Sequence, residues 1–121
     1  MKKEISEYQM ESAGKACALQ VLMSFYEQNY PTIFYDWLSN LETVTSDQFA
    51  SFYFFTKTTI EMPELTYIGD YGFANSNLEV LKAPKLKTIG IDAFYSTDIE
   101  EIYVPEDCTF PLEYEPLIHI I

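Results

Sequence analysis

Hydrophobic positions recur at a fixed period through the second half of this chain. Residues 65–85 and residues 86–106 are two consecutive copies of one pattern. Their matching positions are Leu65/Leu86, Ile68/Ile89, Gly69/Gly90, Phe73/Phe94, Glu79/Glu100 and Pro84/Pro105. A fixed period of about 20 to 30 residues with recurring Leu or Ile indicates a solenoid, because a single repeat cannot bury its own apolar face. We therefore expect a stack of short repeats whose surface suits binding.

Each repeat is expected to contribute one short strand to a small parallel sheet. Side chains alternate along a strand. The pairs expected to point into the core are Ile60/Met62, Leu81/Ala83 and Ile102/Val104. The residues between them form what we call the outward row: Glu61, Lys82 and Tyr103. We also expect Gly69 and Gly90 to take up positive φ in tight turns, and Phe73 and Phe94 to stack as an internal aromatic column.

A degenerate earlier copy precedes these two repeats. It contains Leu41, Val44, Phe49 and the segment 60–63. The spacing from its phenylalanine to its proline exceeds that in the two later copies by three, so it carries a three-residue insertion. The chain is thus expected to hold about three repeats of roughly 21–24 residues.

Residues 1–40 are expected to form helices that cover the exposed end of the solenoid. Apolar side chains at three- and four-residue steps predict a helix from about residue 5 to residue 27. Pro31 suits the first turn of a second helix. A third short helix is predicted from Thr45 through Phe49 and Phe52 to Tyr53, because Thr, Ser and Asp at 45–47 suit a helix start.

These elements predict an α+β fold in a single domain spanning residues 1–121. Residues 1–40 would form a helical N-terminal cap, residues 41–106 the repeats and residues 107–121 a C-terminal cap. The apolar segment 117–121 predicts a closing strand whose free edge would favour association if it stayed unpaired.

The two clear copies resemble the BspA-type leucine-rich repeat family. In that family a half of the form L-x-x-I-G-x-x-A-F is followed by a half of the form L-x-x-I-x-x-P. Segments 65–73 and 78–84 match these halves in the first copy, and segments 86–94 and 99–105 match them in the second. The resemblance implies a leucine-rich-repeat solenoid that serves as a general recognition scaffold.

The charge of the chain is strongly acidic and uneven. Seven Lys, no Arg and nineteen Asp plus Glu give a net charge of −12. Residues 1–60 carry a net −3 and residues 61–121 a net −9. Such a field repels nucleic acid and anionic membranes and attracts basic protein surfaces. We therefore expect a protein partner with a basic surface, no direct contact with nucleic acid and no membrane contact.

The cysteines and the N-terminus indicate a cytoplasmic protein. Cys17 and Cys108 lie far apart and form no Cys-x-x-Cys spacing. Met1 and two lysines are followed at once by glutamates, and the apolar run at 16–23 is too short and too late for a signal peptide.

Motifs that carry reaction chemistry are missing from the sequence. The only histidine, His119, sits in the apolar C-terminal segment, which favours an ordinary strand residue over a catalytic base. The sequence contains no Gly-rich phosphate loop and no zinc spacing. We expect no enzyme activity, cofactor or bound metal. Five carboxylates allow a calcium hypothesis, but solvated surface charge explains them better: Asp98, Glu100, Glu101, Glu106 and Asp107.

Three functional hypotheses remain open. The preferred one is a small acidic cytoplasmic inhibitor that covers a basic surface of another macromolecule, as phage anti-CRISPR or anti-restriction proteins and immunity proteins do. A generic protein-interaction solenoid without charge mimicry is the second, and a calcium- or carbohydrate-binding surface module is the third. The residues expected to bind the partner are Glu61, Glu79, Lys82, Glu100, Glu101 and Tyr103.

Overall fold

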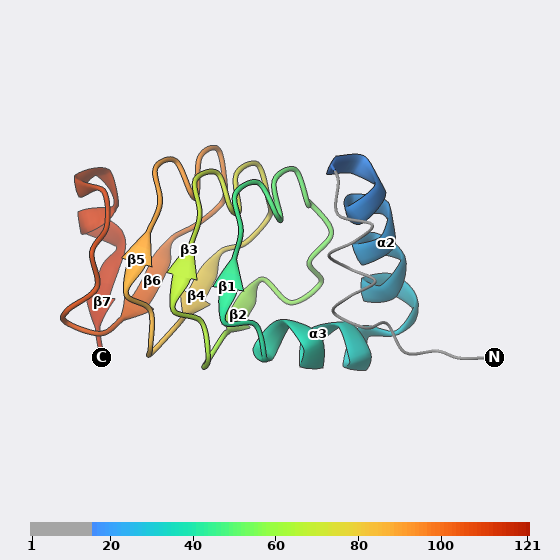
Figure 1. Ribbon diagram of the computed structural model, residues 1–121, viewed down its shortest axis with the longest axis horizontal. Coiled ribbons are helices and arrows are strands. Elements are labelled where there is room, and N and C mark those ends of the chain that lie inside the picture. The colour runs from blue at the N-terminus through green and yellow to red at the C-terminus, as the bar shows by residue number, and fades with distance from the viewer. Residues whose placement is uncertain (1–15) are drawn as a thin grey trace.

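Two parallel β-sheets run along opposite sides of a solenoid with helices at one end (Figure 1). The computed structural model of the chain describes residues 16–121, with side chains from Gln20 onward. The first sheet has the order β1-β3-β5, with strands Thr43–Val44, Tyr67–Ile68 and Thr88–Ile89. The second sheet has the order β2-β4-β6-β7, with strands Thr59–Glu61, Val80–Lys82, Glu101–Val104 and Ile118–Ile120. Every pairing is parallel.

The predicted strands of the repeats are β2, β4 and β6. Their expected inward residues are all buried: Ile60, Met62, Leu81, Ala83, Ile102 and Val104. The strands of the first sheet were not predicted, because two residues are too few to show an alternating pattern. Each passage of the chain around the solenoid therefore contributes one strand to each sheet, and the apolar core lies between them.

The expected aromatic column is present and longer than predicted. Phe73 stacks on Phe94 with ring centroids 5.8 Å apart and planes at 2°. Phe49 stacks on the other side of Phe73 at 5.2 Å and 9°. Tyr114 closes the column edge-on against Phe94 at 5.4 Å. One buried ring from each repeat thus joins the successive turns of the solenoid.

The prediction that Gly69 and Gly90 take up positive φ was wrong. No glycine has positive φ among the described residues. A Cβ added to Gly69 would lie 2.6 Å from the amide nitrogen of Ser46, and one added to Gly90 would lie 2.7 Å from that of Asp70. These glycines are needed because the backbone of the preceding repeat passes too close for a side chain. Positive φ occurs instead at two recurring turn positions: Asp47/Tyr71/Asp92 and Ser51/Asn75/Ser96.

The predicted third helix is absent, because residues 46–51 form turns. Asp47 has a φ of 62° and Ser51 a φ of 65°, which a right-handed helix excludes. The backbone amides of this segment also bond to the next repeat. Phe49 N donates to Gly72 O at 2.8 Å, and Ser51 N donates to Ala74 O at 2.7 Å. The apolar spacing of Phe49 and Phe52 therefore reflects two rings entering one core from a turn.

Two helices, α2 (Ala16–Asn29) and α3 (Pro31–Ser39), lie at the β1/β2 end of the solenoid (Figure 1). Pro31 begins α3 as predicted. Helix α2 continues slightly beyond the predicted end, and the predicted helical residues 5–15 lie outside the described part. Phe34 stacks on Phe52 with centroids 5.8 Å apart, and Trp37 packs on Phe49 at 6.1 Å. These contacts join α3 to the aromatic core of the first repeat.

At the opposite end, the 3₁₀ helix η1 (Leu112–Leu117) leads into β7. Strand β7 pairs with β6 within the segment where a closing strand was predicted, with Ile102 opposite Ile118. Within residues 16–121, no helix is long and apolar enough to cross a membrane.

Candidate functional site

The outward row is present on the second sheet and gains one member. The register places Glu61 beside Lys82, Lys82 beside Tyr103, and Tyr103 beside His119 of β7. His119 was expected to be an ordinary strand residue and was given no role in binding. Its alternation with Ile118 and Ile120 was the one available signal, but the pairing of β7 with β6 could not be derived from it.

Tyr103 is held in place by its neighbours on three sides. Its ring stacks on the His119 ring with centroids 4.7 Å apart and planes at 18°. The ammonium group of Lys82 lies 5.5 Å from the centre of the Tyr103 ring, within cation–π range. The Tyr103 hydroxyl donates a hydrogen bond of 3.0 Å to Glu101 Oε1. The partly buried ring is therefore already ordered for contact with a partner.

The carboxylate of Glu101 lies close to both the Tyr103 hydroxyl and the His119 ring. Its Oε2 lies 4.0 Å from His119 Nε2, while its Oε1 accepts the bond from Tyr103. That hydrogen bond, with smaller contributions from burial and the carboxylate charge, raises the pKa of Tyr103 above its ordinary value of 10.0. The direction of the shift reflects the hydroxyl proton that Tyr103 shares with Glu101 in this hydrogen bond.

The structure places four of the six predicted binding residues on the outward side of the second sheet, which we call the sheet face. These four are Glu61, Lys82, Glu101 and Tyr103. The other two, Glu79 and Glu100, precede β4 and β6 and lie at the margin of the face. Glu79 Oε1 accepts a 2.9 Å hydrogen bond from Thr58 Oγ1, whereas Glu100 is exposed.

The sheet face and its margin are acidic. The six predicted residues hold four carboxylates and one ammonium group, a net charge of −3. Two other lysines of the clear repeats lie close to acidic side chains elsewhere. Lys85 Nζ is 2.9 Å from Glu64 Oε1, and Lys87 Nζ is 3.5 Å from Asp107 Oδ2. Among the lysines of residues 61–121, Lys82 thus supplies the positive charge on this face.

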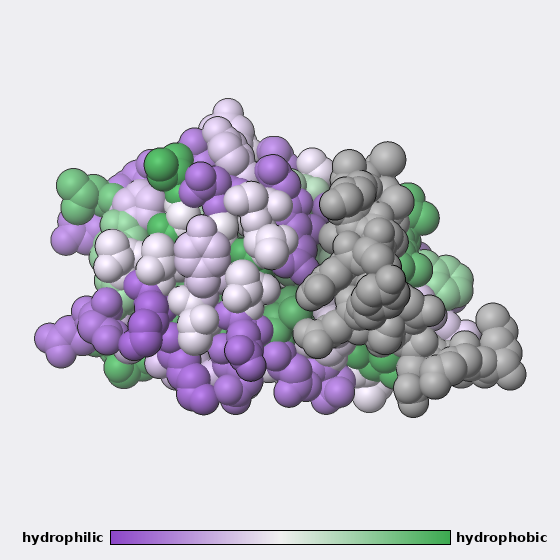
Figure 2. Space-filling view, viewed as in Figure 1, coloured by the Kyte–Doolittle hydropathy of each residue, from purple (hydrophilic) through white to green (hydrophobic). Residues whose placement is uncertain are grey.

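The outer side of the first sheet has a different character. Figure 2 shows that the surface over β1, β3 and β5 consists mainly of hydrophilic and intermediate residues. Its outward strand positions are Thr43, Tyr67 and Thr88. The stacked rings and the flanking carboxylates belong to the second sheet, which is why we assign the candidate site there.

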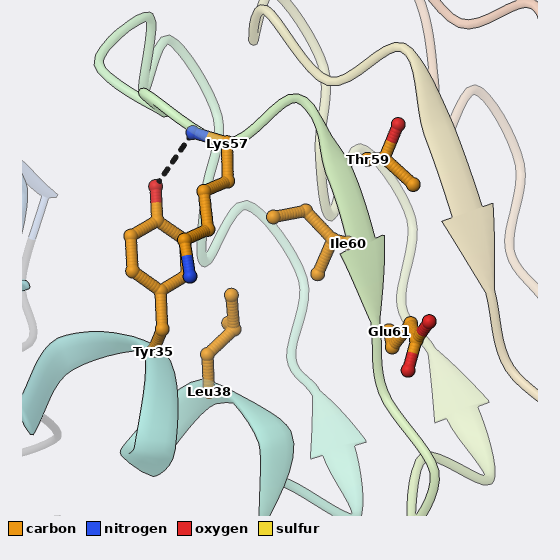
Figure 3. A pocket seen from close by; sticks show the side chains of 6 residues that line it. All are labelled: Tyr35, Leu38, Lys57, Thr59, Ile60 and Glu61. Carbon is orange, nitrogen blue, oxygen red and sulfur yellow. Dashed lines mark hydrogen bonds between the residues drawn. The ribbon is translucent and has the colours of Figure 1, made fainter. Parts of the chain in front are cut away.

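A pocket of about 250 Å³ lies between α3 and β2, beyond the Glu61 end of the sheet face (Figure 3). Its lining residues are Tyr35, Leu38, Lys57, Thr59, Ile60 and Glu61. The Tyr35 hydroxyl accepts a 3.1 Å hydrogen bond from the Lys57 amide and donates one of 2.8 Å to Glu27 Oε2. Burial is the main cause that raises the Tyr35 pKa. This network fixes one wall of the pocket.

Cys108 lacks the features of an activated thiol. It is buried, and burial together with the charge of Asp107 raises its pKa from 9.0 to about 11. The described residues also contain no group of three or more His, Cys, Asp or Glu side chains arranged to hold a metal ion. The five carboxylates considered for calcium therefore form no such group in the part of the chain that is described.

The fold and the exposed sheet face define a solenoid of leucine-rich repeats. The sequence matches the family described as a BspA-type leucine-rich repeat region (six copies) over residues 23–114. Because the match covers most of the chain, this protein belongs to the BspA-type leucine-rich repeat family. Such repeats form protein-binding modules and are typically non-enzymatic. No curated protein and no solved structure matches the chain.

Proposed function

We propose that this chain is a non-enzymatic binding module whose sheet face covers a basic surface of another macromolecule. The observation that carries the proposal is the cluster of Tyr103, His119 and Glu101 at the β6/β7 end of an acidic face. An ordered, partly buried aromatic ring is a common anchor of protein interfaces, because little conformational entropy is lost when it is covered.

The carboxylates around the anchor suit lysine and arginine side chains of a partner. Glu61 and Glu101 lie on the face itself, with Glu79 and Glu100 at its margin. A guanidinium group stacks on an aromatic ring while its N–H groups bond to a neighbouring carboxylate. Tyr103 and Glu101 offer these two elements side by side.

The charge of the whole chain supports a more specific form of the proposal. With a net charge of −12, a chain of 121 residues attracts basic partners over a long range and speeds their association. We propose a small acidic cytoplasmic inhibitor that occupies a basic groove, in the manner of anti-CRISPR, anti-restriction or immunity proteins. In this proposal about three repeats present the face, and α2 and α3 act as the N-terminal cap.

A second candidate is an interface led by the aromatic anchor without charge mimicry. The observation that favours it is Lys82, which lies beside Tyr103 and gives the outward row both signs of charge. The two candidates differ in salt dependence. A mimic weakens steeply as salt screens exposed charges, whereas an anchored interface does not.

Affinity capture with washes at low and high salt, followed by titration of the captured partner, tests both candidates. For a charge-covering inhibitor, binding is lost at high salt, and Glu61→Gln with Glu101→Gln weakens it. For an anchored interface, binding survives salt, and Tyr103→Ala lowers affinity about 30-fold, which corresponds to about 2 kcal/mol. Glu113→Gln is the matched control, because Glu113 is exposed on η1, outside the sheet face. Binding that no sheet-face variant alters would refute both.

A further inference from the structure

Strand β2 has an unpaired edge. It is the terminal strand of the second sheet, and β4 is its strand partner within the described residues. Val80 N donates to Thr58 O at 3.0 Å, and Met62 N donates to Lys82 O at 2.9 Å. In a parallel pair these bonds direct the backbone of even-numbered β2 residues toward β4.

The backbone N–H and C=O groups of Thr59 and Glu61 therefore point away from the sheet. No described residue forms a hydrogen bond with any of these four groups. An unpaired row of this kind is the template on which an extended peptide adds as a further strand. A short extended partner segment would satisfy all four groups.

The pocket between α3 and β2 lies along this edge. Figure 3 shows Ile60 directed toward Tyr35 and Leu38, with Thr59 on the other side of the strand. In a paired strand, the residue opposite Ile60 turns its side chain to the same side as Ile60. That side chain would enter the pocket, whose volume of about 250 Å³ suits one apolar side chain better than a whole small molecule.

Charges at the two ends of the pocket further define the occupant. Lys57 lies at the start of the edge, where its ammonium group is 5.2 Å from the centre of the Tyr35 ring. Glu61 is exposed at the other end. A residue opposite Glu61 has its side chain on the outer side, beside the carboxylate, so a basic residue is favoured there. The complementary segment is an apolar residue with a basic neighbour.

We propose that the free edge of β2 binds an extended segment of a partner protein as an added strand, with one apolar side chain in the pocket and a basic neighbour beside Glu61. This edge is separate from the Tyr103 cluster and binds mainly through backbone groups, so the inference goes beyond the proposed function. A partner that uses both surfaces would lie on the sheet face and continue the sheet past β2.

Selection from a random dodecapeptide library displayed on phage, followed by titration of the enriched synthetic peptides, tests the proposal. We expect enriched peptides to share an apolar residue with a basic neighbour. In amide hydrogen exchange, the Thr59 and Glu61 amides should exchange rapidly in the free protein and become protected when the peptide binds. This readout needs no variant and identifies the edge directly.

Thr59→Pro supplies the matching perturbation. It removes a donor from the free edge, and its ring obstructs an added strand, while the bonds between β2 and β4 stay intact. We expect about a tenfold loss of peptide affinity. Thr43→Pro is the matched control, because Thr43 is an exposed residue on β1, the terminal strand of the first sheet. Thr43→Pro should leave peptide affinity unchanged.

Tyr103→Ala separates this proposal from the proposed function, because it changes the sheet face and leaves the β2 edge intact. Peptide affinity should therefore survive Tyr103→Ala. The edge proposal is overturned if no peptide is enriched, if bound peptide leaves the Thr59 and Glu61 amides unprotected, or if Thr59→Pro binds as tightly as the original chain. None of these results affects the test of the sheet face.

Discussion

Replacing Gly90 by alanine tests why the repeats contain a glycine at this position. An added Cβ would lie 2.7 Å from the Asp70 amide nitrogen and 2.7 Å from the Gly69 carbonyl carbon. Both neighbours are backbone atoms, which cannot rotate away as the end of a flexible side chain can. The turns of two consecutive repeats would therefore have to separate by several tenths of an ångström.

The expected cost follows from two opposing effects. Forcing extra volume into a closely packed site typically destabilises a protein by about 1–3 kcal/mol. Alanine also restricts the unfolded chain, which stabilises a protein by about 0.4–1 kcal/mol where the native φ suits alanine. Because Gly90 does not have positive φ, this second effect applies fully. The steric effect is the larger, so we expect a net loss of about 1–2 kcal/mol.

Urea unfolding followed by circular dichroism measures this difference. Gly72→Ala is the matched control. Its added Cβ would meet side-chain methyl groups of Ile68 at 2.8 Å and Val44 at 3.1 Å and the Gly69 carbonyl oxygen at 3.1 Å, but no backbone atom of the preceding repeat, and the equivalent residue in the next repeat is Ala93. We expect Gly72→Ala to change stability by less than about half the Gly90→Ala loss. A Gly90→Ala protein as stable as the original, or more stable, would refute the close-approach explanation.

Three further predictions concern buried polar groups. Tyr114→Phe removes the hydroxyl that accepts a 3.0 Å hydrogen bond from Phe94 N, so urea unfolding should show a loss of about 1–3 kcal/mol from the unpaired amide. Glu27→Ala removes the carboxylate that accepts the 2.9 Å bond from Thr56 N and should cost at least about 1.5–3 kcal/mol; recovery with Glu27→Gln would show that hydrogen bonding, not charge, is needed. Cys108 has its pKa raised from 9.0 to about 11, so the unfolded chain loses this proton first and stability should fall as pH rises from 9 to 11. The stability of Cys108→Ser should not decrease in this way over the same pH range. An equal decrease in the variant would contradict its attribution to the Cys108 thiol.

The repeat architecture was predictable because the buried positions of each repeat are occupied by apolar residues at a regular spacing. Leu81 and Ile102 recur at one period and alternate with outward residues, and both are buried as expected. The prediction of a helix at residues 45–53 was wrong. It relied on Phe49 and Phe52, which have the spacing of one face of a helix. Local spacing could not show that Asp47 takes up positive φ and that the turn amides bond to the next repeat.

The candidate site was predictable only in part. The outward positions of Glu61, Lys82 and Tyr103 follow from strand alternation alone. The stacking of His119 on Tyr103 depends on which strand β7 joins and in what register, and no short-range pattern fixes either. The pocket beside β2 was also missed, because it forms where α3 packs against a strand that follows much later in the chain.

The nearly constant offset between the paired strands of successive repeats bears on how quickly the chain folds. Thr43 pairs with Tyr67, Tyr67 pairs in turn with Thr88, and Val80 pairs with Glu101, each pair joining one repeat to the next. The entropy lost in closing a loop grows with the logarithm of its length, so each of these closures costs nearly the same. The first pair of repeats must form without a folded neighbour, whereas every later repeat adds to an existing strand edge over the same short distance. Lengthening the chain by one more repeat would leave that first event unchanged.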